Sequence, residues 1–209
     1  MGSRNGGSVT IKGHKPMAPS RLRTIRLSAT EPVTIGGGRL TALDFFSEVR
    51  LARSLEAPGT AIGVWWRRLS RVPFGRRLFS RLIGWMAPYT ATVGARIQDL
   101  GPGYSRWTLR DRRKVRNHLN SIHAVALVNL AEVTSGTAML TALPPGTRGI
   151  VTGLSIQYHK KARGTLTAES RCEVPSIGDD VRYDAHADIR DEAGDLVASA
   201  DVTWLLKRS

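Results

Sequence analysis

The most apolar stretch of the chain runs from Ile122 to Ala142, and its pattern predicts one long helix. Apolar residues occupy almost every position, so no continuous polar face remains. A helix that is apolar all round is enclosed by other structure in a globular protein. Its one acidic residue, Glu132, is also the only one between Asp111 and Glu169. Because burying an unpaired carboxylate is costly, we expect Glu132 to be paired, protonated or used in function.

Strand patterns flank this helix on both sides. Two segments joined by Gly101-Pro102-Gly103 predict a hairpin before it, and Leu143-Pro144-Pro145-Gly146 ends the helix. The predicted strands are 92–100, 103–111, 149–159, 165–174, 180–190 and 196–207. In 180–190 apolar and polar residues alternate, which is typical of a sheet with one buried face. This order predicts an α+β fold in which a six-stranded antiparallel sheet wraps around a long central helix.

The front of the chain differs in composition from the rest. Residues 1–90 carry 15 Lys and Arg against 4 Asp and Glu, whereas residues 91–209 carry 16 against 13. Residues 1–40 are rich in Gly, Ser, Thr, Pro and basic residues, which indicates disorder or an extension ahead of the true start site. We interpret residues 41–88 as a basic amphipathic helical extension, and 89–209 as the folded domain.

Two helical segments are predicted within that extension. Ala42–Leu55 has the apolar spacing of a short helix, and Ile62–Met86 predicts two helices separated at Pro73-Phe74-Gly75. Trp and Arg residues alternate in Ile62–Met86, which suits a helix lying on an anionic membrane surface. The other interpretation is a helix pair that covers the domain's own sheet and leaves the arginines in water. Residues 62–86 are therefore a candidate peripheral membrane contact.

Composition narrows the class of protein. The apolar fraction of 41% is enough for a core, and the single cysteine, Cys172, excludes an intrachain disulfide and fits a reducing compartment. Met1–Ser20 lacks the apolar region of a secretory signal, and no uninterrupted apolar run reaches about 18 residues. We therefore expect a cytoplasmic protein. Because the net positive charge belongs mostly to the front and no phosphate-binding loop is present, we expect no nucleic-acid partner.

Two motifs place this chain beside a known superfamily. Asn117 precedes His123 by six positions, and Glu132 follows His123 by nine. The segment Tyr158 to Gly164 echoes a second motif, an aromatic residue followed by a short Pro-Ala-containing run and a Gly. With these motifs, residues 85–207 resemble the hotdog superfamily, specifically acyl-CoA thioesterases of the phenylacetate-pathway type. They also resemble a hotdog group of unknown function. Ala124-Val125 stands where the thioesterases have Gly-Gly, Asn120 where a Gly is common, and Lys161 where they have a proline.

The start of the predicted helix suits thioester hydrolysis. Backbone N–H groups of Ala124 and Val125, together with the positive end of the helix dipole, can stabilise an oxyanion. Glu132 can activate water or attack directly. Val125 and Glu132 lie on one face but about 10.5 Å apart along the axis, which is too far for a single carbonyl. The resemblance implies homodimers, or dimers of dimers, in which the donor and the acid come from different subunits.

Each candidate residue has a functional and a structural interpretation. The candidate catalytic residues are Glu132, Asn117 and Val125, and the candidate substrate-binding residues are Ala124, His123, Asn129, Ser135, Lys160, Lys161 and Arg163. Alternatively, Glu132 joins a buried hydrogen-bond network with Asn129 or Ser135, Asn117 shapes a turn, and His123 is structural. The three basic residues would meet coenzyme A phosphates or form a solvated strand end. The isolated His118 and His159 predict no metal site.

Three functions fit these residues. The first is an acyl-CoA thioesterase without bound cofactor, in which coenzyme A is part of the substrate. The second is a non-catalytic binder of acyl-CoA or fatty acyl groups, associated with a membrane through residues 62–86. The third is the hydratase or dehydratase chemistry of other hotdog branches, which His123 and Glu132 allow loosely. The order of the motif residues favours the thioesterase.

Overall fold

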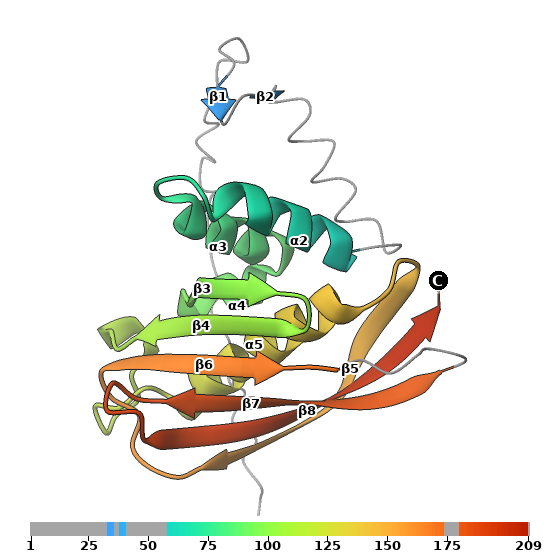
Figure 1. The fold of residues 1–209 in the computed structure, drawn as a ribbon. Helices are drawn as coiled ribbons and strands as arrows, with labels where there is room; N and C mark the ends of the chain where they lie inside the picture. The colour runs from blue at the N-terminus through green and yellow to red at the C-terminus, as the bar shows by residue number, and fades with distance from the viewer. Residues whose placement is uncertain (1–32, 36–37, 41–57, 174–179, 209) are drawn as a thin grey trace, which may run out of the picture. The chain divides into compact units, whose positions relative to one another are not determined.

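The computed structural model describes residues 33–35, 38–40, 58–173 and 180–208 (Figure 1). All described residues belong to one compact unit within 32–209. The predicted helix Ala42–Leu55 lies outside the described residues. In the predicted extension 1–40, two short strands, β1 (Val33–Ile35) and β2 (Gly38–Leu40), pair with each other antiparallel.

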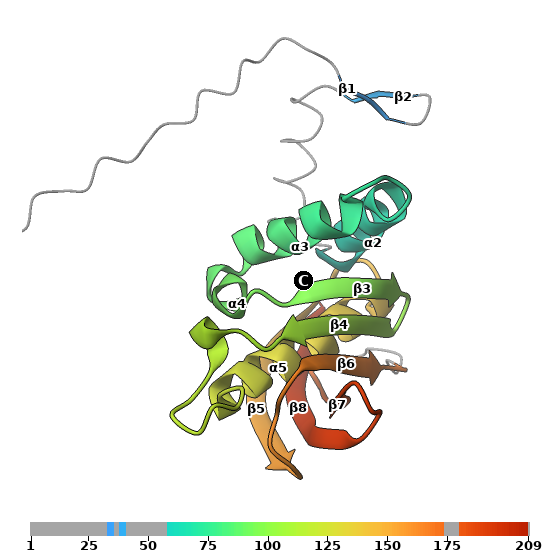
Figure 2. The same ribbon diagram turned by 90° about the vertical axis from the view of Figure 1, so that its left-hand side faces the viewer.

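A six-stranded antiparallel sheet forms the main body of the fold. Its strands are β3 (Arg96–Gly101), β4 (Tyr104–Arg110), β5 (Thr147–Tyr158), β6 (Thr165–Arg171), β7 (Val181–Arg190) and β8 (Leu196–Arg208). They are ordered β3-β4-β6-β7-β8-β5, so the last strand of the chain lies between β7 and β5. The sheet curls around the helix α5 (Ala124–Ala142), as Figures 1 and 2 show. This confirms the predicted α+β hotdog architecture.

Helix α5 is held in the sheet by hydrogen bonds as well as by apolar packing. Trp107 donates its ring N–H to Thr137 Oγ1 at 3.0 Å, and Ser105 donates its hydroxyl to the carbonyl of Thr134 at 2.6 Å. By length and composition α5 is apolar enough to cross a membrane, yet 67% of it is buried inside the structure. Polar residues interrupt α5, so this finding does not contradict the expectation that no uninterrupted apolar run reaches about 18 residues.

Among the described residues, three helices precede the sheet: α2 (Pro58–Leu69), α3 (Gly75–Met86) and α4 (Pro88–Val93). Helix α2 packs on α5, and α3 packs on β3. Trp65, Trp66 and Phe79 are buried in the same hydrophobic cluster as the residues of α5 and the sheet. At Gly59 a Cβ would overlap the carbonyl oxygen of Leu140, so a glycine is needed where α2 meets α5. Residues 62–86 therefore cover the domain's own core on one side.

The predicted strand 92–100 begins later than expected. Residues 88–93 form α4, and the strand β3 starts only at Arg96. Pro88 occupies the first turn of α4, where its fixed φ and missing N–H are tolerated. Gly94 follows the helix with a left-handed φ of 65°, which suits a helix end. These two residues override the β-branched pattern of the segment between them.

Candidate active site at the start of the central helix

A tightly bonded loop leads into α5. The side-chain oxygen of Asn117 accepts hydrogen bonds from the backbone N–H of Leu119 at 2.9 Å and of Ser121 at 3.3 Å. It also accepts the Ser121 hydroxyl at 3.2 Å. Asn120 has a φ of 53°, the left-handed conformation that Asn tolerates better than most residues. The oxygen of Asn117 is thus used in hydrogen bonds that hold the loop in front of His123.

His123 caps the helix. Its backbone is extended, with φ −66° and ψ 140°, and its ring Nδ1 accepts the backbone N–H of Val125 at 3.1 Å. The N–H groups of Ala126 and Leu127 bond to the carbonyl of His123. The N–H of Ala124 has no hydrogen-bond acceptor among the described residues. Of the two donors expected at the helix start, the one on Val125 is occupied and the one on Ala124 is available.

One narrow strip along α5 is less buried than the rest of the helix. The strip is formed by Ala124, Val125, Val128 and Glu132, which lie within about 100° of arc on the helix. Val125 is 50% exposed, and Glu132 is half-buried. Burial raises the pKa of the Glu132 carboxyl above its usual range. The free donor and the only acid of the helix therefore share one surface.

The carboxylate of Glu132 has no hydrogen-bond or ion-pair partner within the described ranges. Ser135 is buried, and its hydroxyl bonds at 3.2 Å to the backbone carbonyl of Glu132, not to the carboxylate. Asn129, one turn before Glu132, is 4% exposed, and its side-chain oxygen is buried with no hydrogen-bond partner in the described part of the chain. Buried amide oxygens are rarely left unpaired in proteins. The side-chain oxygen of Asn129 and the carboxylate of Glu132 thus both lack a partner among the described residues.

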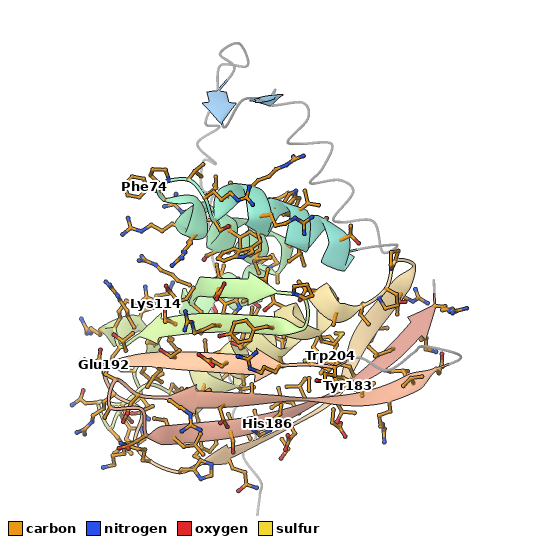
Figure 3. All side chains as sticks on the ribbon, viewed as in Figure 1. Phe74, Lys114, Tyr183, His186, Glu192 and Trp204 are labelled. Carbon is orange, nitrogen blue, oxygen red and sulfur yellow. The ribbon has the colours of Figure 1, made fainter. Side chains whose placement is uncertain are left out.

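A cavity of about 230 Å³ opens beside the helix start. It is lined by Thr92, Val93, Lys114, Val115, Arg116, His123, Val125 and Ala126. The guanidinium of Arg116 is paired with Asp111 at 2.6 Å. Lys114, which is labelled in Figure 3, has no ion-pair partner among the described residues. Sequence reasoning did not single out Lys114. The signal that could have identified Lys114 is the dense run of basic residues between Arg110 and Arg116. The loop that contains this run folds back toward the helix.

The second motif lies beside the first. The hydroxyl of Tyr158 reaches the carbonyl oxygen of Ala124 at 3.4 Å, and the N–H of Ile122 bonds to the carbonyl of Ala162 at 2.8 Å. Tyr158 was recognised only as a motif residue, and its position against the first turn of α5 makes it a further candidate. The structure therefore brings both motifs to the start of α5.

The basic residues of the second motif have different surroundings. Lys160 bonds to the carboxylates of Asp191 at 2.6 Å and Asp195 at 2.8 Å. The hydrogen bond to Asp191 raises the pKa of Lys160 and lowers that of Asp191. Lys161 and Arg163 are exposed, and neither has an ion-pair partner in the ranges described. Lys160 is already neutralised within the chain, and the other two are available to an anion.

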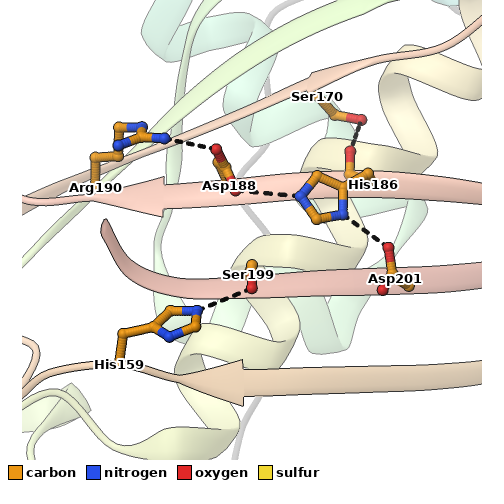
Figure 4. A network of polar contacts seen from close by, with 7 residues as sticks. All are labelled: His159, Ser170, His186, Asp188, Arg190, Ser199 and Asp201. Carbon is orange, nitrogen blue, oxygen red and sulfur yellow. Dashed lines mark hydrogen bonds and ion pairs between the residues drawn. The ribbon is translucent and has the colours of Figure 1, made fainter. Parts of the chain in front are cut away.

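A separate polar network covers the outer face of the sheet (Figure 4). His186 lies between Asp201, at 2.7 Å from Nδ1, and Asp188, at 3.2 Å from Nε2. Arg190 bonds to Asp188 at 2.8 Å. The hydrogen bond to Asp201 contributes most to raising the pKa of His186. His159 bonds separately to Ser199 at 3.0 Å, and the described residues hold no group of three or more side chains suited to a metal ion.

Comparison with known proteins gives a consistent family and fold. The sequence profile of a family described as a domain of unknown function, DUF4442, matches residues 75–206. The crystal structure of the genomics target APC5556 is 27% identical, with a TM-score of 0.62 over 71% of this chain and 99% of that one. A Pseudomonas aeruginosa protein described as a probable thioesterase is 24% identical, with a TM-score of 0.58 over 66% and 97%.

A more distant similarity supports the same fold. A Haemophilus influenzae thioesterase is 17% identical, with a TM-score of 0.53 over 61% of this chain and 90% of that one. The comparison with curated proteins found no match. The match to the family profile spans most of the described sheet and helices, and includes the start of α5.

Proposed function

This chain belongs to the DUF4442 family and has the hotdog fold, and from that premise we propose that it hydrolyses acyl-CoA thioesters at a site shared between two protomers. One observation carries the proposal. A half-buried carboxylate with no partner in the described part of the chain, Glu132, lies on the same strip of α5 as the free N–H of Ala124. An acid kept unpaired in partial burial, with a raised pKa, is typical of a functional group.

In the proposed reaction, the N–H of Ala124 and the dipole of α5 bind the thioester carbonyl oxygen. Glu132 takes a proton from a water molecule, and the resulting hydroxide attacks the carbonyl carbon. The tetrahedral intermediate then collapses, its C–S bond breaks, and the departing coenzyme A thiolate takes the proton from Glu132. The products are a carboxylic acid and the free thiol of coenzyme A.

The distance along α5 requires two protomers. Ala124 and Glu132 are eight residues, or about 12 Å, apart along the helix axis, so one protomer cannot present both to a single carbonyl. The strand β5 supports a homodimer, because it is the end strand of the sheet and carries the exposed apolar residues Ile150, Val151 and Tyr158. A long apolar edge strand invites pairing with another chain. We propose that β5 pairs with β5 of a second copy; further pairing of dimers stays a prediction.

Free cations near the helix start suit the phosphates of coenzyme A. Lys114 lines the cavity beside His123 and Val125, and Lys161 and Arg163 extend from the neighbouring loop. Positively charged side chains without a partner carboxylate are available to form charge-assisted hydrogen bonds with phosphate. In this proposal they bind the nucleotide end of the substrate while the acyl chain lies along the apolar strip of α5. No bound cofactor is needed, and a cytoplasmic location remains our expectation.

Mixing two inactive variants tests the shared site. Glu132→Gln removes the base, and Ala124→Pro removes only the free N–H. A proline is accepted at Ala124, because this is the first helical position and the preceding His123 is extended, with ψ 140°. We expect each variant alone to lose activity by about 10²–10³-fold. Co-expressed, they should regain about one quarter of wild-type activity, since half of the dimers are mixed and each has one intact site.

Several outcomes would overturn parts of this proposal. Mixed variants that stay inactive, while each still forms dimers, would show that the donor and the acid do not belong to different protomers. A Glu132→Gln variant as active as the wild type would end the hydrolase proposal altogether. Ala124→Ser, which keeps the N–H, is the matched control for Ala124→Pro and should retain most of the activity.

The alternative function is non-catalytic binding of acyl-CoA. Two features of Val125 favour it. The N–H of Val125 is already bonded to His123, and its side chain is 50% exposed beside the helix start. A binder would show saturable heat release with acyl-CoA in calorimetry, with the thioester recovered intact. Measuring free thiol in the same sample separates the two functions.

A further inference from the structure

Helix α3 carries a second apolar stripe that does not face the core. Its inward face buries Phe79, Leu82 and Ile83 against the sheet domain. On the opposite side, Phe74 is 75% exposed and Leu78 is 44% exposed. These two positions are one helical turn apart, so they lie on one line along the helix surface. Exposed apolar residues are usually scattered singly, and their alignment on one helix indicates a contact surface.

The backbone presents Phe74 to solvent at a conformational cost. Phe74 is the N-cap residue of α3 and has a φ of 62°, the left-handed conformation. For a bulky side chain this conformation is unfavourable, and glycine would adopt it freely. The ring projects from the start of α3 (Figure 3) and is touched by the guanidinium of Arg77 at 5.5 Å. A strained and exposed aromatic residue is better explained by a contact outside the described chain than by folding.

Arginines surround the stripe, and acidic residues are missing. Between Glu56 and Asp99 the sequence has seven arginines and no Asp or Glu. Arg71, Arg77 and Arg81 are exposed, and none of them has an ion pair with a described residue. Like charges at this density repel one another in water, and an anionic surface would relieve that repulsion.

A hollow beside the stripe gathers three of these cations. It has a volume of about 370 Å³ and lies between the start of α3 and β3. Its lining includes Arg76, Arg77 and Arg96 together with the ring of Phe74, and no acidic residue. Guanidinium groups that line one hollow without a carboxylate suit a phosphate group. The hollow therefore combines a place for an anionic head group with an adjacent apolar edge.

We propose that this α3 surface, formed by Arg71, Phe74, Arg77, Leu78 and Arg81, docks the protein on an anionic phospholipid bilayer. Phe74 and Leu78 enter the boundary between head groups and acyl chains, while the arginines bind lipid phosphates. The surface is compatible with the proposed dimer, because α3 packs on β3 and β5 lies at the other end of the sheet order.

A bilayer fits these features better than a polyanion. Nucleic acid or an acidic protein would satisfy the arginines, but neither needs an aliphatic side chain such as Leu78 beside them. Membrane interfaces accept aromatic and aliphatic side chains and cations together. Binding to a bilayer should therefore depend on Phe74 and Leu78, whereas binding to a polyanion should not.

Vesicle binding by the full chain tests the proposal. Co-sedimentation is measured with phosphatidylcholine vesicles that contain or lack phosphatidylserine. We expect binding only to the anionic vesicles, weakened by salt, and about 25-fold weaker for Arg77→Gln with Arg81→Gln, at about fivefold for each arginine. Arg182→Gln with Arg208→Gln removes the same charge from exposed positions of β7 and β8 and should change the affinity less than about twofold.

The apolar part has its own variants. Phe74→Gly removes the ring and relieves the left-handed strain, so the melting temperature should stay equal or rise while vesicle affinity falls about tenfold. Leu78→Gln should weaken binding about fivefold, whereas Leu119→Gln, at a somewhat more exposed position in a loop, should not. If the arginine variants lose binding but Phe74→Gly and Leu78→Gln do not, the contact is purely electrostatic and the bilayer proposal fails.

A fluorescent label separates this surface from the basic front of the chain. Cys172 is buried, so a label reacts selectively with Leu78→Cys. We expect water-like emission without vesicles, and quenching by brominated lipid when anionic vesicles are added. Emission already shifted in the absence of lipid would mean that the chain itself or a second copy covers the stripe. Sedimentation without quenching would mean that other residues bind the lipid; either result overturns the proposal.

Discussion

The backbone N–H of Val125 donates to the ring Nδ1 of His123 at 3.1 Å, so the imidazole closes the first turn of α5. The first N–H groups of a helix lack partners within the helix, and here a side chain satisfies one of them. The neighbouring N–H of Ala124 stays free of described acceptors. One contact therefore decides which backbone group is left for a substrate oxygen.

The cap should be measurable in stability. His123→Ala removes the acceptor of the Val125 N–H and should lower the free energy of unfolding by about 1 kcal/mol. His123→Asn keeps a side-chain oxygen at the cap and should recover most of that loss. Urea denaturation of the three proteins gives the comparison. Equal stability of the alanine and asparagine variants would show that the contact contributes nothing.

Glu132 should make stability depend on pH. Burial raises the pKa of its carboxyl above the ordinary 4.5, so the folded chain holds this proton more tightly than the unfolded chain. The stability of the wild type should therefore fall as the pH rises from about 4.5 through the raised pKa. Glu132→Gln lacks this loss.

The stability of Glu132→Gln relative to the wild type should increase between about pH 4.5 and the raised pKa of Glu132, and should stay constant at higher pH. Thermal unfolding of both proteins at several pH values measures it, with Glu192→Gln, at an exposed turn, as the control. A wild type that is more stable than Glu132→Gln at neutral pH would reveal a favourable partner for the carboxylate.

Two lysines near the second motif should behave differently toward substrate. Lys114 lines the cavity at the helix start without a described partner, whereas Lys160 is held by Asp191 and Asp195. Lys114→Gln should raise the KM for an acyl-CoA about five- to tenfold, in line with the loss of one charge-assisted contact. Lys160→Gln should leave the KM nearly unchanged. An acyl-pantetheine substrate, which lacks the nucleotide phosphates, should be insensitive to both changes.

The network on the outer face predicts a second pH dependence. Asp201 and Asp188 raise the pKa of His186 above 6.5, so the stabilisation is complete below that value. It is lost as the pH rises through the raised pKa. His186→Gln should therefore cost stability at about pH 6 and much less at about pH 9. Because the ring is 55% exposed, the effect should be small and weaken with added salt. A cost that does not change with pH would point to packing instead.

The fold was largely predictable because its signals are strong and local. A helix that is apolar all round, such as α5, has to be enclosed by other structure. The alternation of apolar and polar residues in β7 determines which face of the sheet packs against the helix. Where the prediction failed, a local rule opposed the pattern. Thr92 and its neighbours favour a strand, yet the proline at 88 and the glycine at 94 define a short helix.

The candidate site was predictable only in part. The spacing of Asn117, His123 and Glu132 pointed to the start of α5 as the candidate site. It did not reveal that the Asn117 oxygen is used within its own loop, or that His123 occupies the N–H of Val125. Such contacts depend on rotamers and on a loop that folds back on itself. Lys114 was missed for the same reason, since only the fold brings it to the helix.

The position of β8 has a consequence for biosynthesis. Four of the six strands around α5 follow it in the sequence, and the final one, β8, lies between β7 and β5. A ribosome thus releases a nascent apolar helix well before its cover exists, and β5 cannot join the sheet until β8 has left the exit tunnel. During that interval part of the apolar surface of α5 stays exposed, which favours aggregation of the nascent chain. In the proposed dimer, the β5 edge therefore becomes available to a second copy only after β8 has joined the sheet.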